Sequence, residues 1–206
     1  MTKTRPAWMV PSGKPWIRGA AKLIYDNAWI NVTEFQCTAP TGRPATYGLV
    51  TMKYMGLGVL PLHDDGTVTL VGQNRFTFAD YSWEIPEGGG PVDGDPLDNI
   101  KRELAEEAGL EAAEWREVLR FQLSNSLTTE TGVGYLATGL SPIAAAPDDT
   151  DDTEDIALAR VPFREALDQA LGGNMLDMIT IAMLLRAYHM AREGELPAQL
   201  TRAMLG

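Results

Sequence analysis

The sequence predicts an α/β fold in which a mixed sheet lies between helices and a small antiparallel sheet precedes it. One observation is a well-delimited amphipathic helix between Asp95 and Gly109, and a second is the series of short apolar runs on both sides of it. A third is the pair of helical segments near the end of the chain. With 206 residues and a hydrophobic fraction of 45%, the chain can build one sizeable core. We expect an N-terminal sheet over residues 1–54 and a main domain over residues 55–206.

The N-terminal region alternates strand and turn signals. Strands are expected at Leu23–Tyr25, Trp29–Cys37 and Thr46–Tyr54, because β-branched and aromatic residues recur there between clusters of Asp, Asn, Pro and Gly. Residues 1–20 are rich in Pro, Gly and Trp and are expected to be irregular. The region is therefore predicted to form a small antiparallel sheet.

The main domain is predicted to combine strands and helices around the central helix. His63, Asp64, Asp65 and Gly66 indicate a hairpin turn between the first two strands. Residues 144–155 are rich in Pro and acidic residues and indicate an exposed loop. The other expected elements are strands at Leu57–Leu62, Val68–Gln73, Trp115–Gln122 and Val133–Gly139, and helices at Phe163–Leu171 and Met175–Arg192.

The central helix has an acidic face beside an apolar stripe. Asp95 suits its N-cap and Gly109 the left-handed position that ends it. Glu103, Glu106 and Glu107 fall within an arc of about 100°. Such like charges destabilise a helix unless something neutralises them, and a divalent cation with oxygen ligands would do so. The alternative is a solvated surface helix. The adjacent stripe consists of Leu97, Ile100, Leu104 and Ala108.

The stretch that contains this helix resembles the Nudix box. The box reads GX5EX7REUXEEXGU, with U a bulky aliphatic residue, and residues 88–110 read GGGPVDGDPLDNIKRELAEEAGL. Gly88 matches the first glycine, and the second half matches in register from Arg102 to Leu110. One position departs, because the isolated glutamate of the box falls on Gly94, between Asp93 and Asp95.

This resemblance implies the Nudix α/β/α sandwich and a metal-binding acidic face. The main metal ligands of the family correspond to Glu103 and Glu107, with Glu106 assisting. By the same resemblance Glu106 and Glu107 are catalytic, and we expect Arg102 to orient the glutamates through a salt bridge. The implied cofactor is Mg²⁺, with Mn²⁺ as a substitute.

Residues before the box narrow the resemblance to the branch that cleaves ADP-ribose and nucleoside diphosphate sugars. That branch reads GQ-x-R and then W-E-x-P-x-G, as residues 72–75 and 83–88 do here. Arg75 suits either a pyrophosphate or a salt bridge to a carboxylate. Trp83 suits either stacking on a base or packing in the core. By resemblance Glu87 joins the metal shell through its backbone carbonyl, its own carboxylate being an alternative.

The loop after the box supplies a candidate base. The ADP-ribose branch carries S-P-G-x-x-x-E in this loop, and its glutamate corresponds to Glu130. Asn125 and Ser126 replace the proline and the glycine, which indicates a substrate other than ADP-ribose alone. A solvated loop glutamate is the alternative interpretation of Glu130.

Composition limits the partners. A net charge of −11 argues against nucleic acid polymers and anionic membranes, and bound cations would allow an anionic nucleotide substrate to bind. Cys37 is the single cysteine, and no run of 18 apolar residues or secretory signal is visible, so we expect a cytoplasmic protein.

The expected function is metal-dependent hydrolysis of the pyrophosphate bond of ADP-ribose or a related nucleoside diphosphate sugar. The products would be a nucleoside monophosphate and a sugar phosphate. Three alternatives stay open: a Nudix hydrolase of dinucleoside polyphosphates or a coenzyme pyrophosphate, a non-catalytic nucleotide-binding Nudix module, and a structural protein with an incidental acidic helix.

We also expect a homodimer. Residues 1–54 carry more aromatic surface than a small sheet buries alone, and the ADP-ribose branch dimerises through this region. By resemblance, Trp29 would contact the base across the interface, although packing in the core is an alternative.

Overall fold

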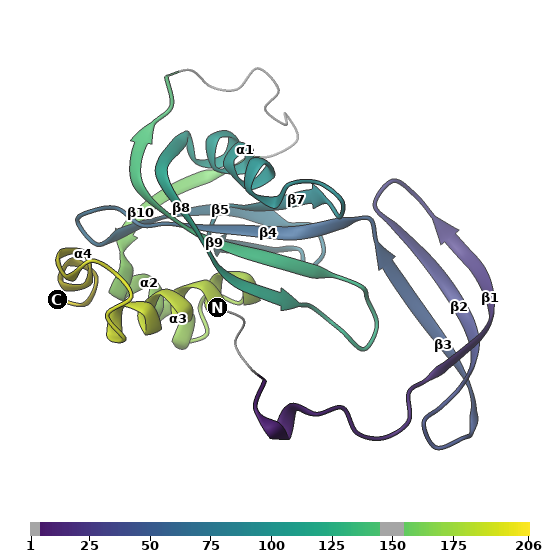
Figure 1. Ribbon diagram of the computed structural model, residues 1–206. Coiled ribbons are helices and arrows are strands. Elements are labelled where there is room, and N and C mark those ends of the chain that lie inside the picture. The colour runs from purple at the N-terminus through teal and green to yellow at the C-terminus, as the bar shows by residue number, and fades with distance from the viewer. Residues whose placement is uncertain (1–4, 145–154) are drawn as a thin grey trace. The chain divides into compact units, whose positions relative to one another are not determined.

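The computed structural model describes residues 5–144 and 155–206 (Figure 1). The chain divides into two compact units. Of the described residues, the N-terminal unit contains 5–53 together with Ser124–Thr129, and the main unit contains 54–123, 130–144 and 155–206. Most of the predicted acidic loop at 144–155 lies outside the described residues.

The N-terminal unit is built on a three-stranded antiparallel sheet, as predicted. Strands β1 (Ile17–Asp26), β2 (Ile30–Thr38) and β3 (Pro44–Met52) are adjacent in that order, and a 3-10 turn, η1 (Ala7–Met9), precedes them. The expectation of irregular structure through residue 20 was wrong at its end, because β1 begins at Ile17. Pairing with β2 extends that strand beyond its apolar run, since backbone hydrogen bonding does not require apolar side chains.

The main unit contains two sheets. The first has the order β7 (Glu87–Pro91), β4 (Tyr54–Pro61), β9 (Thr131–Pro142) and β8 (Leu110–Gln122). Strands β4 and β9 are parallel and the other neighbours antiparallel, so this sheet is mixed. The second sheet is antiparallel, with the order β10 (Ala157–Pro162), β5 (Thr67–Arg75) and β6 (Asp80–Glu84).

The predicted hairpin between β4 and β5 forms its turn but not its ladder. The turn closes through hydrogen bonds from His63 N–H to Thr67 O and from Gly66 N–H to His63 O, both 2.9 Å. The two strands meet only at the Leu62–Val68 bridge and then enter different sheets. Each strand finds its partners elsewhere in the chain, which the local sequence cannot indicate.

Helices cover the sheets from two sides (Figure 1). Helix α1 (Pro96–Ala108) packs on the mixed sheet through a cluster that includes Leu57, Leu104 and Tyr135. On the other side, the larger core cluster includes Phe163 and Met183. This arrangement confirms the predicted α/β/α sandwich. The helices on that second side are α2 (Phe163–Leu171), α3 (Met178–Arg192) and α4 (Ala198–Leu205).

Four elements of the main unit were not predicted, namely β6, β7, β10 and α4, of which β10 and α4 lie near the end of the chain. Strand β10 pairs along its length with β5, and α4 buries only Leu200 and Met204. Both segments are short, so periodicity identifies them poorly. Among the described residues, every helix is too short or too polar to cross a membrane.

Candidate active site

Helix α1 is held by the caps that the sequence predicts. The Asp95 carboxylate accepts a hydrogen bond from Leu97 N–H at 2.8 Å and so caps the helix. Gly109 adopts the left-handed conformation, with φ 63°, and its N–H donates to Ala105 O at 3.1 Å. Leu104 is fully buried on the sheet side, which turns the carboxylates toward the neighbouring strand.

The acidic face of α1 is compensated by one arginine. The Arg102 guanidinium binds Glu103 Oε1 through Nη2 at 2.5 Å and Glu106 Oε2 through Nη1. The predicted salt bridge is therefore present. Only 13% of the Glu103 side chain and 15% of the Glu106 side chain are exposed. Arg102 therefore offsets the negative charge of two carboxylates that water screens only weakly. Glu107 is buried and accepts a hydrogen bond from Glu87 N–H at 2.9 Å.

Strand β7 approaches α1 closely because Gly88 has no side chain. A Cβ at Gly88 would overlap the carboxyl group of Glu103. The missing side chain leaves room for the carboxylates beside the strand, and their oxygens are the donors that hard divalent cations prefer. The acidic face therefore fits such a cation chemically. In the described part of the chain no three His, Cys, Asp or Glu side chains converge as a metal-binding group, and Arg102 supplies positive charge there.

The carboxylate of Glu87 lies against α3. Its Oε1 accepts a hydrogen bond from the Thr180 hydroxyl at 3.1 Å, and that hydroxyl accepts one from Ile85 N–H at 3.0 Å. Asp177 caps α3 by accepting from Thr180 N–H at 2.6 Å. Burial, and then the nearby Asp177, raise the pKa of Glu87 well above its usual range. The backbone N–H of Glu87 is thus bound by Glu107 of α1, whereas its carboxylate is bound by Thr180 of α3.

Arg75 and Glu84 form a forked ion pair on neighbouring strands. Arg75 Nε lies 3.1 Å from both Glu84 carboxylate oxygens, and Nη2 binds Oε2 as well. The hydrogen bond to Glu84 raises the pKa of Arg75, although burial acts in the opposite direction. The salt-bridge interpretation of Arg75 is thus observed, and Nη1 is not part of the pair.

A cavity of about 750 Å³ brings together residues that are far apart in the sequence. Its described lining includes Arg75 from β5, Glu87 from β7, Glu130 before β9 and Asp177 at the start of α3. Phe78 lies at its edge with 83% of its surface exposed. Arg75, Glu87 and Glu130 were predicted as site residues, and the fold collects them in one cavity.

Comparison with known proteins identifies the family. Residues 52–179 match the NUDIX domain. The chain belongs to the Nudix family. It is 30% identical over 170 residues to an ADP-ribose pyrophosphatase of Mycobacterium tuberculosis, which covers 82% of this chain and 81% of that protein. It is 24% identical over 161 residues to a CMP-5'-(N-acetyl-N-hydroxy-3-aminopropyl)phosphonate hydrolase of Streptomyces rubellomurinus, covering 77% of this chain and 75% of that one.

The fold is shared with a solved structure described as the crystal structure of ADP compounds hydrolase. The two agree with a TM-score of 0.77 over 91% of this chain and 100% of that chain, at 14% sequence identity. The protein is therefore a Nudix hydrolase with the fold expected of that family.

The two predicted tryptophans take different positions in this Nudix hydrolase. Trp83 packs against the larger core cluster and meets Tyr81 edge-on, with ring centroids 5.8 Å apart. It is not among the described residues that line the cavity, so the core interpretation is the observed one. Trp29 lies in the N-terminal unit, between β1 and β2, and is 62% exposed.

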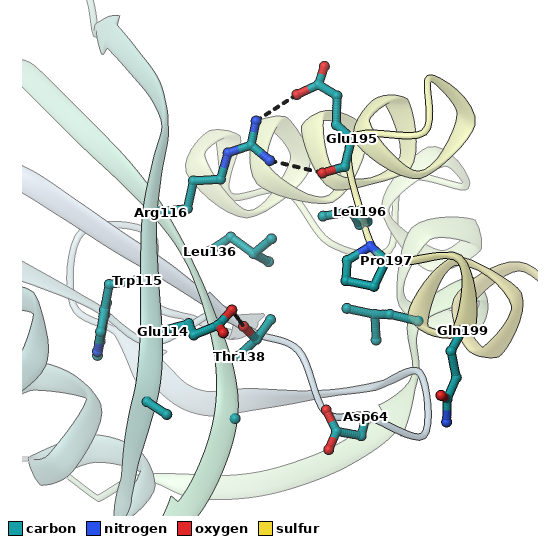
Figure 2. A pocket seen from close by; sticks show the side chains of 13 residues that line it. Asp64, Glu114, Trp115, Arg116, Leu136, Thr138, Glu195, Leu196, Pro197 and Gln199 are labelled. Atoms are coloured by element: carbon teal, nitrogen blue, oxygen red, sulfur yellow. Dashed lines mark hydrogen bonds and ion pairs between the residues drawn. The ribbon is translucent and has the colours of Figure 1, made fainter.

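Another cavity, of about 550 Å³, lies between the β8–β9 pair and the segment that leads into α4 (Figure 2). Arg116 spans its edge and donates to the Glu195 carbonyl at 3.1 Å and carboxylate at 2.9 Å. Glu114 accepts from Thr138 on its wall. None of the predicted site residues belongs to its described lining.

Two residues of the site were missed by sequence reasoning. Thr180 holds the Glu87 carboxylate, and Glu84 holds Arg75. Thr180 follows the N-cap Asp177 by three residues and reads as an ordinary first-turn residue. Only its contact with a segment 93 residues away reveals its role.

Proposed function

We propose that this Nudix hydrolase cleaves the pyrophosphate bond of ADP-ribose or a related nucleoside diphosphate sugar and depends on Mg²⁺. The observation that carries this proposal is the cavity that holds Arg75 and Glu130 beside Glu87, whose main chain is bound by Glu107 of the acidic helix. The 30% identity to an ADP-ribose pyrophosphatase supports the same substrate class.

In this proposal the metal-binding residues are Glu103, Glu106 and Glu107, together with the backbone carbonyl of Glu87. Bound Mg²⁺, or Mn²⁺ in its place, would offset the charge of the phosphate oxygens. Arg102 orients Glu103 and Glu106 through the ion pairs described above.

The remaining steps fall to residues of the cavity. Glu130 takes a proton from the attacking water, and the departing phosphate leaves as a monoester. Arg75 binds a phosphate oxygen through Nη1, since Glu84 engages its Nε and Nη2 and holds the guanidinium in one orientation.

A substrate panel tests the proposal. The protein is incubated with ADP-ribose, other nucleoside diphosphate sugars, a dinucleoside polyphosphate and a coenzyme pyrophosphate, each with Mg²⁺ and with Mn²⁺. Release of a nucleoside monophosphate and a sugar phosphate is the expected result. Failure to cleave any member under both metals would refute it, and cleavage of a different class would reassign the substrate.

We further propose that the enzyme is a homodimer that forms through residues 1–54. Strand β1 is exposed along its whole length, with Leu23 at 60%, and Trp29 is exposed beside it. A second copy would cover this apolar surface and would let Trp29 contact the base of the partner's substrate. Light scattering at micromolar concentration should give twice the 22.5 kDa chain mass, whereas a value of 22.5 kDa would contradict the proposal.

A further inference from the structure

The turn between β5 and β6 carries a pair of exposed phenylalanines. Strand β5 ends at Arg75 and β6 begins at Asp80, so residues 76–79 form the turn. Phe76 is 99% exposed, and Phe78 is exposed as well. Of the two, Phe78 belongs to the described lining of the cavity of about 750 Å³ and Phe76 does not. The two rings thus share one turn but differ in their access to the proposed active site.

The turn places Phe78 close to the arginine that is proposed to bind phosphate. Phe78 N–H donates to Arg75 O at 3.3 Å, and Ala79 N–H donates to the same oxygen at 2.9 Å. The first of these bonds closes a β-turn, in which the Cα atoms of the first and fourth residues lie within about 7 Å. In a nucleotide a single ribose ring separates the phosphate from the base, which is a comparable span. A nucleotide whose phosphate binds Arg75 can therefore reach Phe78 with its base.

The backbone directly after Phe78 is strained. Ala79 has a φ of 51°, in the left-handed region that a residue with a Cβ rarely adopts. Such residues persist where the surrounding structure holds them, and they cluster at functional sites. Here the pairing of Arg75 with Asp80 closes the ladder at the base of the turn. The ladder therefore holds the turn in a conformation that keeps Phe78 at the cavity.

The lining of this cavity contains both charged and exposed apolar side chains. Arg75 and Glu130 are half-buried, whereas the apolar side chains of Phe78, Leu176 and Met178 are largely exposed. All of these residues belong to the main unit. Neighbouring exposed apolar side chains commonly mark a place where a ligand or a partner binds. A nucleotide combines charged phosphates with a base that has apolar faces, so it matches both kinds of lining.

The apolar edge suits the base of the substrate better than its sugar. A base presents a flat face that stacks on an exposed aromatic ring. A sugar carries hydroxyl groups that lose their bonds to water unless the protein replaces them. The side chains of Phe78, Leu176 and Met178 offer no strong donor or acceptor for such hydroxyls. The chemistry of this edge therefore favours contact with a nucleobase.

We infer that Phe78 stacks on the base of the substrate and makes binding at this site depend on a nucleotide. This inference rests on the proposed function, in which Arg75 binds a phosphate of a nucleoside diphosphate sugar. Phe78 and Arg75 belong to the same unit, so the contact requires no second copy of the chain. A base has two faces, so this contact is compatible with the one proposed for Trp29 of a second copy.

The first experiment measures binding without hydrolysis. Wild type and Phe78→Ala are titrated by calorimetry, in the presence of Mg²⁺, with AMP and with ribose 5-phosphate, which share the ribose phosphate and differ in the base. Wild type should bind AMP more tightly than ribose 5-phosphate. Phe78→Ala should raise the Kd of AMP by roughly tenfold, the usual effect of removing a ring on which a base stacks. The Kd of ribose 5-phosphate should stay the same.

Matched variants separate stacking from other roles of the ring. Phe76→Ala changes an equally exposed ring of the same turn that is not in the described lining, so it should keep the affinity for AMP. Phe78→Tyr keeps a flat ring and should bind AMP as the wild type does. Phe78→Leu keeps apolar bulk without a flat ring and should bind AMP as weakly as the alanine variant. Light scattering should give every variant the mass of the wild type.

Hydrolysis then separates this inference from the proposed function. Phe78→Ala should raise KM for ADP-ribose and keep kcat, because stacking on the base is equally strong before and during bond cleavage. If the panel shows no cleavage while AMP binding depends on Phe78, the proposed function fails and the inference stands.

Several results would overturn the inference. One is a Phe78→Ala variant that binds AMP as the wild type does, and another is an equal loss of affinity for AMP and for ribose 5-phosphate. Wild-type affinity for AMP in Phe78→Leu would show that stacking is not involved. A lower mass of Phe78→Ala in light scattering would assign the ring to a contact between subunits instead.

Discussion

The carboxylates on the two sides of strand β7 are held in different ways. On the α1 side, Glu103 and Glu106 share the Arg102 guanidinium. On the α3 side, Glu87 accepts a hydrogen bond from the Thr180 hydroxyl, and burial, followed by the nearby Asp177, keeps the pKa of Glu87 high. The first group binds a positive charge, and the second is stabilised by hydrogen bonding in a buried place. Acidic residues of one site can therefore differ in role: those on α1 form ion pairs with a cationic group, whereas Glu87 forms a hydrogen bond that holds β7 to α3.

The largest expected effect comes from the α1 side. Glu107→Gln keeps the shape and removes the charge, so kcat should fall by about two to three orders of magnitude while the fold is retained. Steady-state kinetics and circular dichroism measure the two properties. Glu114→Gln, a change on the wall of the other cavity, should keep full activity. Full activity of Glu107→Gln would remove this residue from the mechanism.

The next prediction concerns the space between β7 and α1. In Gly88→Ala the added methyl group overlaps the Glu103 carboxyl, so the carboxylate has to move and Arg102 with it. We expect a loss of up to about 3 kcal/mol in the free energy of unfolding and a clear loss of turnover. Gly89→Ala is the control, because its Cβ would meet Tyr54 Cβ at an ordinary 3.7 Å. Equal behaviour of the two variants would show that the close approach is unimportant.

A substitution on the α3 side should mainly change the free energy of unfolding. Thr180→Val leaves Ile85 N–H and the Glu87 carboxylate without their common partner in a fully buried place. The free energy of unfolding in urea should fall by about 1 to 2 kcal/mol. Thr180→Ser keeps the hydroxyl and should lose much less. A valine variant as stable as the wild type would mean that other groups hold Glu87.

The smallest effect should come from an exposed carboxylate that has two cationic partners. Hydrogen bonding to Arg186, followed by its charge and that of Arg116, lowers the pKa of Glu195 below the usual 4.5. A lowered pKa in the folded state stabilises the fold above the unfolded value, and this stabilisation is lost as pH falls through the folded value. Unfolding measured between pH 6 and pH 3 should therefore lose less stability in Glu195→Gln than in the wild type. An identical pH profile would show that solvent screens the pair.

The local sequence by itself determined where helix α1 begins and ends and which of its charged side chains lie on one face. Asp95 and Gly109 delimit α1 because a cap needs only residues that are adjacent in the chain. The spacing of Glu103, Glu106 and Glu107 places them on one face because the helix has a fixed period. The ion pair of Arg102 follows from the same spacing, since residues four apart are neighbours.

Tertiary structure decided where those parts meet the rest of the chain. The Glu87 carboxylate turns to α3 because the fold places the hydroxyl of Thr180, 93 residues later in the sequence, within hydrogen-bonding distance. Strands β4 and β5 separate after one bridge because β9 and β10 offer each of them a longer ladder. The loop before Glu130 attaches to β3 because β3 is the edge strand of its sheet and the backbone of Val50 is available there for pairing. Each of these outcomes is a choice between hydrogen-bonding partners that only the folded chain brings within reach, and no local pattern encodes it.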